Sequence, residues 1–149
     1  MRETIEHPLL GTLGLDEYFY VQEVPFSMFG KPVKLTISID VYPDDDYAIE
    51  ENQELAIGFF TQLRDDFGSI CEQAIREHCR RIVEEGWPPQ PELVVADSDH
   101  LWSYAVRFPA TFEEPTWGLA CVVEWWDKGL GIKFVRDKIV EVGSEHLLT

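Results

Sequence analysis

The chain has 149 residues, of which 45% are hydrophobic and 27% are charged. It is therefore long enough for one domain with a buried core, residues 1–149, and too apolar to be disordered. Twenty-eight acidic residues against 12 basic ones give a formal net charge of −16. A field of that sign repels nucleic acid and anionic membranes, which are recognised by clustered Lys and Arg. It attracts a basic protein partner, although solubility alone is a simpler explanation for it.

The N-terminal residues and the cysteines indicate where the protein resides. Residues 1–7 lack the basic start and apolar run of a signal peptide, and no segment has the roughly 20 apolar residues that cross a bilayer. Cys71, Cys79 and Cys121 are an odd number without the spacing of a disulfide framework. We therefore expect a cytoplasmic protein.

The first part of the chain predicts two strands. Residues 17–24 are rich in aromatic and β-branched side chains. Residues 33–42 alternate between apolar and more polar side chains, which is typical of a strand with one buried face. Pro25, Gly30 and Pro32 lie in the turn between them, so we expect an antiparallel pair.

The middle of the chain predicts two helices, at about 50–67 and 69–85. Gly68 and Ser69 supply a C-terminal stop for the first helix and an N-cap for the second. In the second helix we expect Ile75 to be fully buried and Arg76 to face solvent. Its apolar stripe repeats every four residues and consists of Ile70, Cys71, Ala74, Ile75, His78, Cys79, Ile82 and Val83.

The C-terminal third returns to strands. The β-forming segments are 101–108, 117–126, 131–135 and 139–142, with a tight turn at residues 136–138. Strands, two helices and further strands predict an α+β fold, in which an antiparallel sheet of about five to six strands carries both helices on one face.

Acidic residues between the second strand and the first helix are the main candidates for binding a basic partner. Three consecutive aspartates point in different directions and are not followed by the glycine of a calcium loop, so a solvated loop is favoured over a calcium site. Trp126 adds an aromatic side chain of the kind found in binding hot spots. The predicted partner-binding residues are Asp44, Asp45, Asp46, Glu50, Glu51, Glu54 and Trp126.

An enzyme is the alternative. Asp97, Asp99 and His100 have the alternation of a small metal or hydrolase site, although Asp and Ser are also common in turns. Zinc bound by the cysteines with His78 is disfavoured, because their spacing is not that of a structural zinc knuckle. No nucleophile elbow, zinc-protease motif or phosphate loop is present in the sequence. We therefore predict no catalytic residues, cofactor or metal.

The C-terminal third also carries a strand–turn–strand signature, which runs Trp125-Trp126-Asp127-Lys128-Gly129-Leu130-Gly131. Together with the order of elements, this signature resembles that of a group of small, uncharacterised bacterial cytosolic domains. Some members of that group are immunity proteins of polymorphic toxin systems. The resemblance implies a non-enzymatic binding role, and the acidic surface fits a partner such as a basic nuclease toxin. Self-association through the outer face of the sheet is a further alternative.

Overall fold

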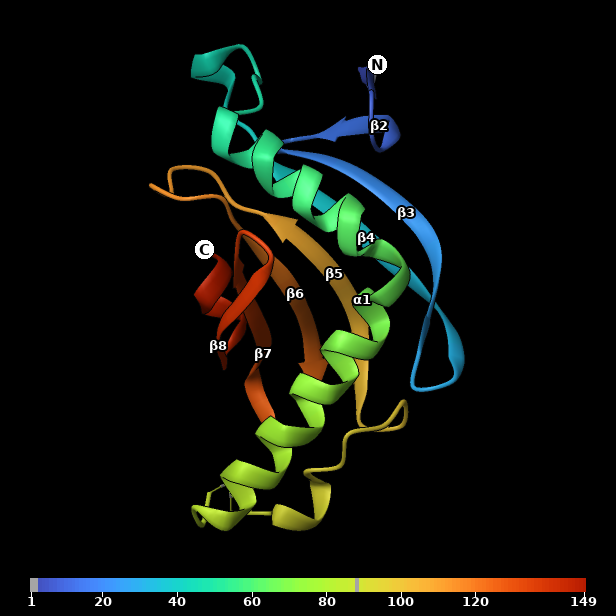
Figure 1. Cartoon of the computed structure of the whole chain (residues 1–149), viewed down its shortest axis with the longest axis vertical. Coiled ribbons are helices and arrows are strands. Elements are labelled where there is room, and N and C mark those ends of the chain that lie inside the picture. The colour runs from blue at the N-terminus through green and yellow to red at the C-terminus, as the bar shows by residue number, and fades with distance from the viewer. Residues whose placement is uncertain (1–2, 88) are drawn as a thin grey trace.

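The computed structural model describes residues 3–87 and 89–149 and places eight strands of that part in one sheet beside one long α-helix (Figure 1). Three short 3-10 helices complete it: η1 (Pro43–Asp45), η2 (Pro91–Leu93) and η3 (Glu145–Leu148). The strands and the helix are β1 (Thr4–His7), β2 (Gly11–Asp16), β3 (Phe19–Met28), β4 (Lys31–Asp40), α1 (Glu51–Glu84), β5 (Leu101–Phe108), β6 (Thr116–Val123), β7 (Trp126–Val135) and β8 (Lys138–Gly143).

The strands lie in the sheet in chain order, and every neighbouring pair is antiparallel except β4 and β5, which are parallel. The expected antiparallel sheet of five to six strands is therefore wrong. The helix connects β4 to β5, and a helical crossover returns the chain to the same end of the sheet, which makes the two strands parallel. Glu124 and Trp125 form a turn that divides the predicted segment 117–126 between β6 and β7.

The two predicted helices are one continuous helix of 34 residues. Gly68 does not end the helix, because its backbone is not in the left-handed conformation that a glycine stop requires. Gly86 has that conformation, with φ of 81°, and the helix ends just before it. A Cβ at Gly68 would lie 3.1 Å from the Ser27 carbonyl oxygen and 3.3 Å from the Phe26 ring, so the glycine permits close packing on β3. Figure 1 shows that α1 bends about halfway along its length, and Gly-Ser pairs are a common cause of such bends.

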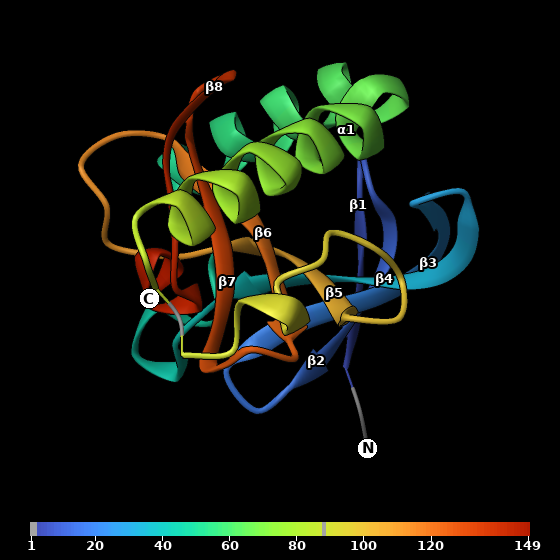
Figure 2. The same ribbon diagram turned by 90° about the horizontal axis from the view of Figure 1, so that it is seen from below.

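The core lies between α1 and one face of the sheet (Figure 2). Ile75 has no exposed surface and Arg76 is exposed, which confirms the expected orientation of this part of the helix. Trp117 is the centre of an aromatic cluster: it stacks on Phe134 with ring centroids 4.3 Å apart and also contacts Phe60. Such ring pairs contribute about 0.5–1.5 kcal/mol each beyond the area that they bury.

The short helix η3 packs on the opposite face of the sheet, where glycines let it approach the strands. A Cβ at Gly131 would lie 2.5 Å from the Ser144 carbonyl oxygen, and one at Gly118 would lie 2.9 Å from a methyl carbon of Leu148. This contact therefore explains Gly131 of the C-terminal signature, whereas Gly129 has a positive φ of 69° and lies close to the Cys121 carbonyl. None of the described helices is long and apolar enough to span a membrane.

Candidate functional site

Exposed carboxylates gather where β4 leads through η1 into α1. Between Asp40 and Glu54 the chain has seven acidic residues and no basic one. Four of them are exposed and form no ion pair among the described residues; we call these four the acidic end: Asp44, Asp45, Asp46 and Glu51.

The other two predicted carboxylates of this region have structural roles. Glu50 caps α1 in a reciprocal capping box with Gln53 and also accepts a hydrogen bond from the backbone N–H of Thr111 at 3.0 Å. Glu54 lies 2.5 Å from Nε2 of His7, which is buried. The six predicted carboxylates therefore divide into four that face solvent and two that stabilise the fold.

Three exposed aromatic side chains lie next to the acidic end, and the sequence analysis missed them. Tyr18 is 53% exposed, and Phe19 and Tyr42 are each 41% exposed. The Val41 N–H donates to the Tyr18 carbonyl at 2.8 Å, and Phe19 pairs with Asp40 across β3 and β4, so the two segments are adjacent. The signal was present in the run Tyr-Phe-Tyr at 18–20, of which only Tyr20 is buried.

A cavity of about 390 Å³ opens beside these aromatic side chains. Ile37 and Ile39 are buried under α1, so alternation along β4 turns Ser38 and Asp40 to the opposite face. Burial raises the pKa of Asp40, while a hydrogen bond from the backbone N–H of Ala110 acts in the other direction. The cavity is lined by Phe19, Ser38, Asp40, Tyr42, Arg107, Leu148 and Thr149.

Trp126 lies at the other end of α1 from the acidic residues. Its ring meets Trp87 edge-on at 5.3 Å, and Lys128 lies over it at 5.8 Å. It lines a cavity of about 460 Å³ together with His78 and Ile82. The 28 residue steps from Glu54 to Ile82 correspond to about 42 Å along the axis of α1. The predicted binding residues therefore do not form one surface.

The alternative catalytic residues are only partly assembled. Oδ1 of Asp97 accepts hydrogen bonds from the backbone N–H groups of Asp99 and His100 at 3.0 and 3.1 Å and lies 2.6 Å from Nδ1 of His100. This hydrogen bond raises the pKa of His100 and lowers that of Asp97. Nε2 of His100 lies 3.6 Å from Glu124, whereas the carboxylate of Asp99 acts on His100 only as a minor electrostatic contribution to its raised pKa. Asp97 thus stabilises a turn.

The three cysteines are buried, and burial raises their pKa values, to about 11 for Cys79 and about 12 for Cys121. They therefore remain protonated thiols that pack as small apolar groups. Burial, with Arg81 as a second cause, lowers the pKa of nearby His78. Across residues 3–87 and 89–149, no three His, Cys, Asp or Glu side chains are grouped so that they could hold a metal ion.

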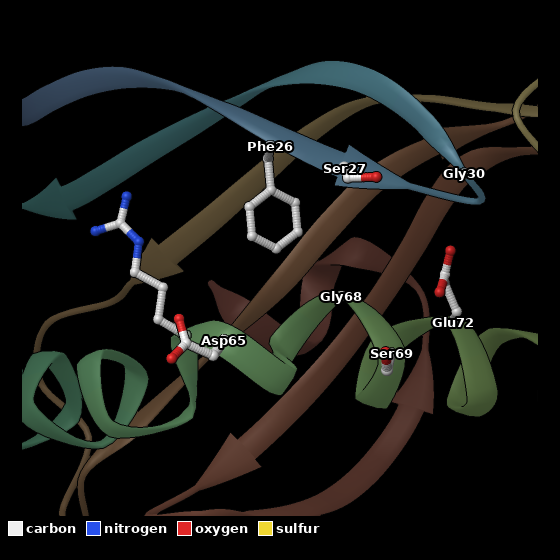
Figure 3. Close-up of a pocket in the computed structure, with 8 residues that line it drawn as sticks. Phe26, Ser27, Gly30, Asp65, Gly68, Ser69 and Glu72 are labelled. Carbon is white, nitrogen blue, oxygen red and sulfur yellow. The ribbon is translucent and has the colours of Figure 1, made fainter.

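A polar groove of about 260 Å³ lies between the β3–β4 hairpin and the middle of α1 (Figure 3). The Phe26 ring extends from β3 toward Gly68, and Glu72 extends from α1 toward the hairpin. The Glu72 carboxylate accepts the backbone N–H of Phe29. The side chains of this groove therefore join the hairpin to the helix.

Comparison with known proteins identifies the family but no characterised relative. The model of a domain of unknown function, DUF6985, matches residues 9–148, which is nearly the whole chain, so the chain belongs to that family. No curated protein and no solved structure matches it.

Proposed function

We propose that this member of the DUF6985 family is a non-enzymatic binding module of the cytoplasm that binds a basic protein partner through the acidic end. The observation that carries the proposal is the position of Asp44, Asp45, Asp46 and Glu51: all four are exposed, and no basic residue lies between residues 40 and 54. These carboxylates have no cationic partner among the described residues, so they are available to the Lys and Arg side chains of another protein.

The adjacent aromatic side chains supply binding energy that charge alone does not provide. Charge complementarity mainly raises the association rate and selects the partner, whereas binding energy concentrates in a few large side chains such as Tyr and Trp. Tyr18, Phe19 and Tyr42 lie exposed beside the acidic end and are suited to that role. The proposed interface therefore combines an electrostatic rim with an aromatic centre.

An immunity protein that occludes a basic toxin is the form of this function that we favour. The net charge of −16 suits a cationic nuclease, because a protein that binds nucleic acid presents clustered Lys and Arg. The acidic end would cover such a surface by mimicking the charge of the nucleic acid.

Co-purification with the products of adjacent genes tests the proposal. The tagged chain should retain one basic product at about 50 mM NaCl and release most of it at about 500 mM, because exposed charges are screened over a shorter distance at high salt. A matched pair of variants localises the interface. Replacing Asp44, Asp45 and Asp46 by Asn should abolish retention at moderate salt, and the control Glu92→Gln, Asp137→Asn and Glu141→Gln, which removes the same charge elsewhere, should not. Retention of no adjacent product at low salt contradicts the proposal.

A further inference from the structure

A cavity flanks the acidic end on the sheet face opposite α1, and its chemistry is specific. Its volume of about 390 Å³ is within the range of cavities that hold a small ligand or a side chain. Phe19 and Tyr42 contribute aromatic walls, and Asp40 contributes a carboxylate. Because Tyr42 directly precedes η1, the cavity adjoins the segment that carries Asp44 and its neighbours.

The charges around the cavity favour a cation. Arg107 also lines it, but its guanidinium is 3.8 Å from the Glu145 carboxylate, which balances its charge. Asp40 is not within ion-pair distance of any described cation, but Arg107 acts on it at longer range and lowers its pKa against the larger effect of burial. Asp40 and Glu145 are therefore two carboxylates that share one guanidinium. The three aspartates of the adjoining segment add to the negative potential near the cavity.

We propose that this cavity receives an arginine side chain of the basic partner, with Asp40 accepting its N–H groups and Phe19 and Tyr42 packing against its planar face; this inference rests on the proposed function. A guanidinium presents several donors in a fixed plane and stacks on aromatic rings, which a lysine ammonium does not. The cavity then acts as the anchor of the interface, and the acidic end guides the partner toward it.

Binding of a single capped amino acid tests the anchor without the partner. The probe is Nα-acetyl-arginine amide, added at low salt to the ¹⁵N-labelled chain. We expect saturable shifts of the amide signals of Ser38, Asp40 and Arg107, with a dissociation constant in the millimolar range. The matched probe is Nα-acetyl-citrulline amide, which has the same shape but no charge, and it should give no saturable shift.

Two variants decide where the probe binds. Asp40→Asn keeps an acceptor for the Ala110 N–H and should weaken binding of the arginine probe about tenfold, because a charge-assisted hydrogen bond is lost. Asp44→Asn removes the same charge outside the cavity and should weaken it about twofold at most. Tyr42→Ala, at an exposed side chain, should also weaken binding. Equal binding of citrulline, or equal effects of Asp40→Asn and Asp44→Asn, overturns the inference.

The outcome is separable from that of the proposed function. If the chain retains a basic partner but does not bind the arginine probe, the arginine site is refuted and the proposed binding function stands. If the chain binds the probe in the cavity but retains no adjacent gene product, the guanidinium site stands and the proposed binding of a basic partner is refuted.

Discussion

Substituting Ile75 with alanine tests the packing of α1 on the sheet. Ile75 lies in the middle of the second half of the helix and has no exposed surface. Truncation removes its buried carbons and leaves a cavity, so the free energy of unfolding should fall by about 2–5 kcal/mol. That is a large share of the roughly 5–15 kcal/mol that stabilise a typical domain.

Urea unfolding measures this loss. With a typical dependence of about 2 kcal/mol per molar urea, the midpoint should move down by about 1–2.5 M. Gln73→Ala is the matched control on the exposed face, and its effect should stay within about 0.5 kcal/mol. Arg76 is a poorer control because its guanidinium lies over the Phe29 ring at 5.3 Å. Equal effects of Ile75→Ala and Gln73→Ala would refute the assignment of the buried face.

Three further predictions concern glycines and histidines. Gly58→Ala should raise the free energy of unfolding by about 0.5–1 kcal/mol, measured by the same urea assay, because Gly58 is helical and a Cβ there meets no atom within 4 Å. Gly131→Ala should lower it by about 1–3 kcal/mol and speed hydrogen exchange in η3, since its Cβ would overlap the Ser144 carbonyl; unchanged exchange would contradict this. In an NMR titration His78 should have a pKa below 6.5 and His100 one above it. Because the folded pKa of His78 is lowered, the free energy of unfolding should decrease as the pH falls below 6.5. Because the folded pKa of His100 is raised, its stabilising contribution is present at low pH and is lost as the pH rises through that pKa.

Local patterns of the sequence predicted those elements whose burial follows one period. The strict alternation at 33–42 identified β4, and Leu35, Ile37, Ile39 and Val41 are buried as expected. The bounds predicted for 101–108 are those of β5. The helical stripe around Ile75 was also correct except at its end, where Val83 is 40% exposed. A helix that packs on a sheet must repeat its apolar residues with the period of the turn.

Features that depend on contacts between distant residues were not predictable in this way. Gly68 resembles a helix stop, yet it is required by the approach of β3, which the local sequence does not reveal. The strands β1 and β2 were missed because β2 contains two glycines and lacks β-branched core residues, so its pairing with β3 determines its conformation.

In the candidate site, too, some features follow from the local sequence and others depend on contacts between distant residues. The exposure of the three consecutive aspartates was predictable from the loop between a strand and a helix. The aromatic side chains beside them come from the start of β3 and the turn before it, and from the segment between β4 and η1, so only the folded chain brings Tyr18 and Phe19 next to Tyr42. Trp126 was chosen for its chemistry, but the fold places it at the far end of α1.

Association kinetics with a co-purified basic partner test the central claim most directly. The rate constant should be measured by stopped flow at several salt concentrations, for the parent chain and for the two variants that each remove three charges. The account predicts that replacing Asp44, Asp45 and Asp46 by Asn lowers the rate constant about tenfold at low salt and flattens its salt dependence. The control Glu92→Gln, Asp137→Asn and Glu141→Gln should change it about twofold at most. Equal rates for the two variants would contradict the account, because net charge and not the acidic end would then govern binding.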